Sequence, residues 1–192
     1  MALNMERFFY YAALFERLEV DRVFIVDARD LLFQGDPFSN WKADLEVFCE
    51  DPSVTIGSCP YNSMWVGRKY GPEKLAQLAD KPIICAGTTR GTRAAMLNYC
   101  RLMCDEIEND ATGLNIDQGA HNRLVYDGLL DPVCITPNKQ GCVQTVGNQQ
   151  TFVFDRQGRL LNDDGRPCPV VHQFDRHPVF FNLLGVKSDY VQ

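Results

Sequence analysis

Apolar and polar residues follow two periodicities along this chain. Apolar residues recur every three to four positions in some segments, which is the spacing of one face of an α-helix. The helices expected from this spacing and from the turn residues beside them cover residues 5–19, 73–79, 92–109 and 118–127. Asn4 and Asp117 are suited to be the N-caps of the first and last of these helices, because their short polar side chains accept backbone N–H groups.

Short apolar runs bounded by glycine, proline and acidic residues predict the strands. These runs cover residues 23–26, 45–49, 82–86, 132–136, 143–146, 151–155 and 170–172. The first run, Val-Phe-Ile-Val, is continuously apolar and predicts a strand buried on both faces of a parallel sheet. Turn signals at 157–158 and 163–165 indicate a hairpin, whereas residues 53–67 are expected to be irregular, with Tyr61 and Trp65 as candidates to line a pocket.

Together these elements predict one α/β domain over residues 1–192. We expect a Rossmann-like, mostly parallel sheet flanked by helices, with a small C-terminal β-hairpin region. The length suits a single domain with a real core. The 45 % hydrophobic content argues against disorder.

Two candidate functional residues directly follow the first predicted strand. Asp27 and Asp30 lie just after the Val-Phe-Ile-Val run, and open α/β sheets bind ligands at the carboxyl ends of their strands. Two carboxylates at this position can hold a hard divalent cation through oxygen. The alternative is that both residues only cap a turn or the next helix.

Charge and cysteine content exclude some classes of protein. The formal net charge of −6 disfavours a nucleic-acid binder that relies on a broad basic surface. No apolar run approaches the roughly 20 residues of a membrane span, and no signal-peptide pattern is visible. None of the eight cysteines forms a Cys-x-x-Cys pair, so buried free thiols are favoured over a zinc site, with disulfides in a lumenal protein as the open alternative.

Three further polar positions stand out. Arg7 lies in the first turn of a helix, where a cation gains nothing from the helix dipole, which hints at an anionic partner. Gly87 follows the apolar run 82–86, and a glycine there lets a ligand approach the backbone. His172, at a strand end beside a polar cluster, is a better ligand candidate than His121 or His177.

The order of these features resembles the GT-A glycosyltransferase superfamily, in particular the retaining branch with glycogenin and bacterial lipopolysaccharide galactosyltransferases. The resemblance extends from Arg7 to Arg176. In order, its elements are a helical Arg7, a DxD-like turn Asp27-Ala28-Arg29-Asp30, a small-residue turn Cys85-Ala86-Gly87, the pair Asp117-Gln118 with the later Asn122, and the strand-end His172.

The resemblance implies a hexosyl transfer from a nucleoside-diphosphate sugar to a glycan or other hydroxyl acceptor, with retention, and a role for each motif residue. Under it, Arg7, Asp27, Ala86 and Gly87 border the donor. Asp27, Asp30 and His172 hold Mn²⁺ or Mg²⁺, and Asp117 and Gln118 lie at the reacting face.

Two departures from the family pattern keep alternatives open. Arg29 occupies the position of the second carboxylate of a plain DxD motif, so either Asp30 serves as metal ligand or Arg29 itself neutralises phosphate without a metal. The first nucleotide-binding βα segment of the family is missing before Arg7, so we expect an N-terminally truncated domain. Its location is open between the cytoplasm and, if a membrane anchor has been removed, the Golgi lumen.

Two other functions compete with glycosyl transfer. The first is a non-catalytic relative that binds a glycan or a protein. The second is a phosphohydrolase of the haloacid dehalogenase type, which ranks last because its second aspartate would stand where this chain has Arg29.

Overall fold

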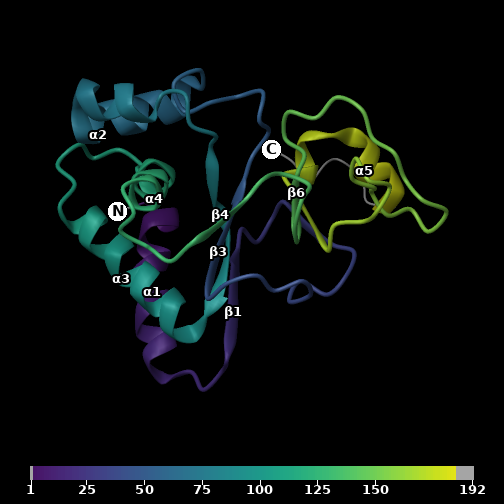
Figure 1. Cartoon of the computed structure of the whole chain (residues 1–192), viewed down its shortest axis with the longest axis horizontal. Helices are drawn as coiled ribbons and strands as arrows, with labels where there is room; N and C mark the ends of the chain where they lie inside the picture. Colours follow the sequence, from purple (N-terminus) through teal and green to yellow (C-terminus); the bar gives the residue numbers. More distant parts are fainter. Residues whose placement is uncertain (1, 185–192) are drawn as a thin grey trace.

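The computed structural model describes residues 2–184 as a mixed α/β structure with five α-helices and two small sheets (Figure 1). The helices are α1 (Leu3–Arg17), α2 (Pro60–Leu78), α3 (Arg93–Glu108), α4 (Asp117–Tyr126) and α5 (Pro178–Leu184), with a 3-10 turn η1 (Phe174–Arg176). The strands are β1 (Arg22–Val26), β2 (Leu31–Phe33), β3 (Leu45–Cys49), β4 (Ile84–Thr92), β5 (Cys134–Thr136), β6 (Val143–Thr145) and β7 (Val170–His172).

Both sheets mix parallel and antiparallel pairs. The larger sheet has the order β1-β4-β3-β5, in which β4 runs antiparallel to both of its neighbours and β3 pairs in parallel with β5. The smaller sheet has the order β2-β7-β6, with an antiparallel and a parallel pair. The α/β class is therefore confirmed, but the mostly parallel sheet is not, because the central strand β4 is reversed.

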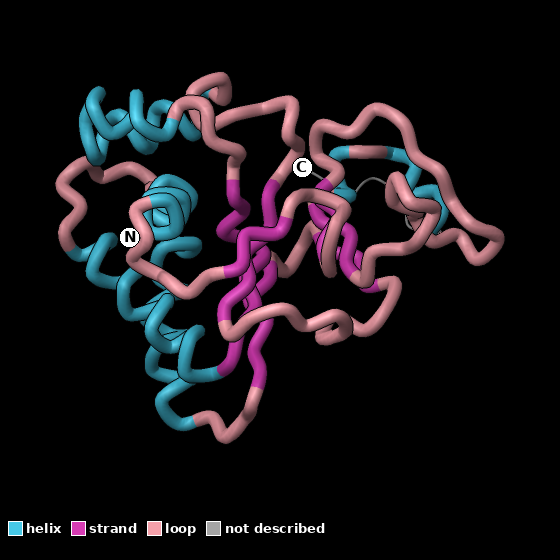
Figure 2. Tube along the Cα trace, in the orientation of Figure 1, coloured by secondary structure: helices cyan, strands magenta, loops and turns pink. Residues whose placement is uncertain are grey.

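The larger sheet lies between a layer of helices and the smaller sheet. Helices α1, α3 and α4 cover one face, and the chain around β6 and α5 lies on the other (Figures 1 and 2). Ile25, Val47 and Ile84 pack against the helices. Phe24 and Phe48 point the opposite way, toward β6 and β7. Alternate residues of a strand face opposite sides, which gives these strands their two packed surfaces.

The helices differ from the expected ones mainly at their N-termini. Helix α2 begins at Pro60, so the expectation of an irregular stretch up to residue 67 is wrong there. Gly71, with a positive φ of 84°, interrupts it at a kink, and the second segment, from Pro72, covers most of the helix expected at 73–79. Asn4 and Asp117 are not N-caps: both lie inside their helices, and Ala2 and Ile116 occupy the cap positions.

Two strand predictions fail for opposite reasons. The strand expected at 82–86 was expected to end at Gly87, but residues 87–91 continue β4, because threonines favour an extended backbone and the glycines allow close approach of neighbouring groups. Residues 151–155 form no strand; only Phe154 bridges to Leu160. The two predicted turns exist, with positive φ at Gly158 and Gly165, but each closes a single bridge rather than a hairpin.

All eight cysteines are free thiols, and most of them are buried. Among the helices of residues 2–184, none combines the length and apolar character needed to cross a membrane.

Candidate functional site

Asp27 owes its position to the antiparallel pairing of β1 with β4. The strand β1 ends where β4 begins, and the Asp27 N–H donates to the Gly87 carbonyl at 2.9 Å. A Cβ atom on Gly87 would lie only 2.1 Å from Asp27 Oδ2, so this site admits only glycine if the carboxylate keeps its place. The predicted proximity of Asp27 and Gly87 is thus found, although through antiparallel strands rather than the parallel edges that we expected.

Asp27, Asp30 and His172 come together at this end of the sheets. The Gln173 N–H donates to the Asp30 carbonyl at 2.8 Å, just beyond the β2–β7 pair, and this bond aligns the His172 segment with the acidic turn. His172 Nε2 lies 3.7 Å from Asp27 Oδ2 and 3.5 Å from Asp30 Oδ2. One potential ligand atom from each of the three residues lies within 4.8 Å of the others.

Two atoms of this cluster are buried without a hydrogen-bond partner in the described chain. They are His172 Nε2 and Asp30 Oδ1. Buried polar atoms without partners are rare and costly, so such atoms call for an explanation. Two carboxylates and an imidazole are the donor types that divalent cations take in proteins, and these residues therefore fit a bound cation.

The charges of the cluster are strongly coupled. Burial opposes ionisation of Asp27, but His172 and Arg7 outweigh it and lower the pKa of Asp27 to about 2. Burial raises the pKa of Asp30, and the nearby Asp27 adds to that effect. Burial opposes the charged form of His172, yet Cys85 and the two carboxylates hold the pKa of His172 well above its usual value. A proton is thus favoured where a divalent cation would lie.

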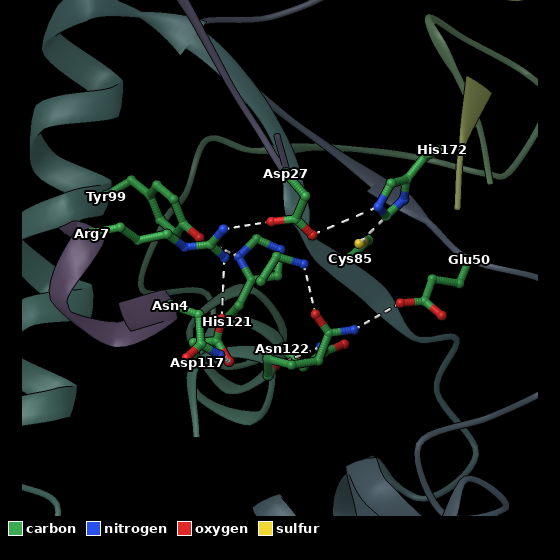
Figure 3. A network of polar contacts seen from close by, with 12 residues as sticks. Asn4, Arg7, Asp27, Glu50, Cys85, Tyr99, Asp117, His121, Asn122 and His172 are labelled. Carbon is green, nitrogen blue, oxygen red and sulfur yellow. Dashed lines mark hydrogen bonds and ion pairs between the residues drawn. The ribbon is translucent and has the colours of Figure 1, made fainter. Parts of the chain in front are cut away.

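Arg7 links this cluster to the start of α4. Its Nη1 donates to Asp27 Oδ1 at 2.6 Å and its Nη2 donates to Asp117 Oδ2 at 3.1 Å, so Asp27 lies between Arg7 and His172 (Figure 3). Asn4 donates to the other oxygen of Asp117 at 3.2 Å. Burial raises the pKa of Asp117, and Arg7 opposes that rise. Asp117 therefore receives its contacts from α1, which is not the arrangement of a helix cap.

The residues after Asp117 attach α4 to β4 and β3. Gln118 Oε1 accepts the Ala86 N–H at 2.8 Å, and Gln118 Nε2 donates to Glu50 Oε1 at 2.9 Å. One turn later, the Asn122 amide both accepts from Ile84 N–H and donates to the Ile84 carbonyl, each at 2.8 Å. The Asp-Gln helix start with its trailing Asn thus has a physical role: it pairs with the first residues of β4, which β1 does not cover.

These side chains line a cavity of about 690 Å³. Its wall includes the predicted residues Arg7, Asp27, Ala86, Gly87, Asp117 and Gln118, and also Tyr61 and Trp65 of α2, for which pocket lining and ordinary packing were equal alternatives. Ligand sites are usually concave and carry a few convergent polar groups. The cavity therefore brings together most of the residues that the sequence singled out.

Three residues that the sequence analysis considered as candidates, Arg29, His121 and His177, do not line this cavity. Arg29 is largely exposed, with 74 % of its side chain accessible, and faces Asp175 at 3.7 Å rather than the cavity. His121 is buried with its Nδ1 2.8 Å from the Tyr99 hydroxyl. His177 Nε2 contacts the Val146 carbonyl at 2.7 Å.

Sequence reasoning missed Glu50 and Arg176, which also line the cavity. Glu50 follows a buried apolar strand just as Asp27 does, so the same signal could have found it. Arg176 had no such signal, because it reaches the cavity from η1, after Gln173 turns the chain with a positive φ of 61°.

Comparison with known proteins adds no assignment: no protein-family model matches this chain, and no curated protein matches it.

Proposed function

We propose that this chain transfers a hexosyl group from a nucleoside-diphosphate sugar to a hydroxyl acceptor, with a divalent cation held by Asp27, Asp30 and His172. The observation that carries the proposal is the buried His172 Nε2, which has no hydrogen-bond partner and faces two carboxylates beside a cavity of about 690 Å³. The proposal is also supported by the resemblance, because most of the residues that it implies, with the exception of Arg29, lie close together.

The charge balance around the cavity supports a need for the cation. Four carboxylates, those of Asp27, Asp30, Glu50 and Asp117, surround or adjoin it, against three cationic groups, the guanidiniums of Arg7 and Arg176 and the protonated imidazole of His172. An anionic diphosphate would meet a net negative site unless a cation were bound. Arg29 does not supply the missing charge, since it faces Asp175 and is mostly exposed. We therefore favour Mn²⁺ or Mg²⁺ over neutralisation by Arg29.

The residues of the cavity have separate tasks in this proposal. When bound, the cation stabilises as a Lewis acid the negative charge that grows on the leaving diphosphate oxygen. Arg176 lies exposed on the cavity wall and can contact a phosphate. Arg7 holds the carboxylates of Asp27 and Asp117 in place. Asp117 stabilises positive charge on the sugar carbon as its bond to phosphate breaks and a bond to the acceptor oxygen forms. Retention of configuration stays a prediction from the resemblance.

The test is calorimetric titration of UDP and of GDP into the chain, with and without Mn²⁺. We expect nucleotide binding that requires Mn²⁺. We expect Asp30→Asn to weaken this binding at least tenfold, since the cation loses a negatively charged ligand. The exposed Asp80→Asn serves as the matched control and should leave binding unchanged. Equal binding of the nucleotide with and without Mn²⁺ would refute the cation site, and no binding of either nucleotide would refute the donor.

A non-catalytic role is the second candidate, and one observation favours it. Both polar ends of Gln118 are occupied, by Ala86 and Glu50, and Arg7 is bound to two carboxylates. A donor would have to compete with these contacts. A chain that binds a glycan but neither UDP nor GDP would support this second function.

A further inference from the structure

A second cavity of about 610 Å³ adjoins the first. It lies beyond the ends of β3 and β5, next to the end of α4. Its apolar wall consists of Tyr126, Ile135 and neighbouring prolines, including Pro137. Its volume is in the range of small-molecule sites, roughly 300–1,000 Å³. None of the motif residues discussed above accounts for it.

Glu50 lines both cavities. It directly follows β3, and its Oε1 accepts the Gln118 N–H on the side of the first cavity. The Cys85 thiol, a weak hydrogen-bond donor, also contacts this carboxylate. A partly buried carboxylate between two cavities, with a single N–H donor among residues 2–184, is placed to contact ligands in both.

The charged groups of the second cavity disfavour an anionic ligand. The carboxylates of Glu50, Asp51 and Asp163 outnumber the ammonium groups of Lys81 and Lys139. A second nucleotide or another phosphorylated ligand would therefore be disfavoured.

The free hydrogen-bonding groups of this wall are few. Asn138 donates to the Thr145 carbonyl and accepts the Thr145 N–H, so the backbone of Thr145 holds its side chain in place in the wall. The Gln140 side chain makes no hydrogen bond within residues 2–184. The Lys81 ammonium lies 5.9 Å from the Tyr126 ring and forms no ion pair with a carboxylate of residues 2–184. The apolar wall suits the C–H faces of sugar rings, and these two free groups suit their hydroxyls.

We propose that the second cavity binds the acceptor, a neutral saccharide, whose reacting hydroxyl donates a hydrogen bond to Glu50 at the junction with the donor cavity. This inference rests on the proposed function, because an acceptor presupposes a donor in the first cavity. Burial raises the pKa of Glu50, which strengthens its carboxylate as a hydrogen-bond acceptor.

Two isoleucines allow the cavities to be observed separately. Ile83 lines the first cavity and Ile135 lines the second, whereas Ile107 is a core residue that lines neither. We would label isoleucine methyl groups with ¹³C and follow their NMR shifts on titration with UDP and diamagnetic Mg²⁺. Maltose, lactose and the methyl glycosides of glucose, galactose and mannose would then be added at millimolar concentration. We expect UDP–Mg²⁺ to shift Ile83, at least one saccharide to shift Ile135, and Ile107 to stay fixed.

Filling the second cavity gives the matched variant. Ile135 is 39 % exposed, so Ile135→Trp should fold, occupy the cavity and raise the Kd of the bound saccharide at least tenfold. Val153, which is 65 % exposed and lines neither cavity, provides the control Val153→Trp, which should leave the Kd unchanged.

The outcomes separate the two proposals. If UDP–Mg²⁺ shifts Ile83 but no saccharide shifts Ile135, the acceptor assignment is overturned and the proposed donor site stands. If a saccharide shifts Ile135 while UDP and GDP shift nothing, the donor function fails and the acceptor role fails with it. A Kd that is equal in both tryptophan variants would also overturn the assignment of this cavity.

Discussion

Replacement of Arg90 by methionine should strongly destabilise the protein. Arg90 lies on β4 with no exposed surface and pairs with Glu46 of β3, which is equally buried. Its Nε and Nη2 donate to Glu46 Oε2 at 2.8 and 2.7 Å, and its other N–H groups donate to the carbonyls of Pro37, Ser39 and Asn40. All five donors of a guanidinium are thus used.

The magnitude follows from what the substitution leaves behind. Arg90→Met leaves the Glu46 carboxylate buried with a single remaining donor, the Thr136 hydroxyl at 2.7 Å. Removing one partner of a buried ion pair costs about 3–5 kcal/mol. The loop carbonyls that Arg90 binds can turn to water, so we add little for them. Since a domain unfolds with about 5–15 kcal/mol, we expect a loss that is a large part of the total.

The assay is urea unfolding followed by the fluorescence of Trp41, whose ring lies 5.1 Å from the Arg90 guanidinium. The double variant Arg90→Met/Glu46→Leu should recover much of the loss, because it removes both charges. The exposed pair of Arg101 and Glu16 supplies the control, and Arg101→Met should cost about 0–1 kcal/mol. A loss below about 1 kcal/mol for Arg90→Met, or a double variant no more stable than the single one, would refute the reasoning.

Three further predictions concern the site and its surroundings. Burial lowers the pKa of His121 from 6.5 to about 3. As the pH falls, the unfolded state therefore takes up a proton on this side chain before the folded state does. The contribution of neutral His121 to the free energy of unfolding is complete above the unfolded pKa and should fall by about 1.4 kcal/mol per pH unit as the pH drops below that value. Urea unfolding of wild type and His121→Gln over a pH series should give different slopes of unfolding free energy against pH. Identical slopes would contradict the prediction. Gly87→Ala should displace Asp27 and weaken Mn²⁺ binding about tenfold or more, as measured by calorimetry. Gly35→Ala is the control, because its Cβ would meet its nearest neighbour at an ordinary 3.4 Å. Equal Mn²⁺ affinities of the two variants would count against the cation site. Asp117→Asn should lower hexosyl transfer about 100-fold or more with little change in the unfolding midpoint, and full turnover in that variant would remove Asp117 from the reaction.

The local signals in the sequence predicted most elements because each element follows from a few neighbouring residues. The helix at 92–109 and the strands at 45–49 and 170–172 were predicted to within about two residues of their bounds, as expected for strongly patterned segments. Strand direction is different, since it depends on pairings between residues far apart in the chain. The reversal of β4 could not be read from its own residues, and neither could the continuation of that strand through 87–91.

The candidate site was nevertheless predicted in large part, and the reversed strand explains why. The resemblance placed Asp27 and Gly87 together beside a donor, in a sheet that was expected to be mostly parallel. The antiparallel pair brings the end of β1 next to Gly87 of β4, which places the same two residues side by side. Residues at strand boundaries were therefore grouped as the structure groups them, without the correct topology. Glu50 and Arg176 needed the three-dimensional arrangement, because their relevance comes from the cavities that they line and not from the residues next to them.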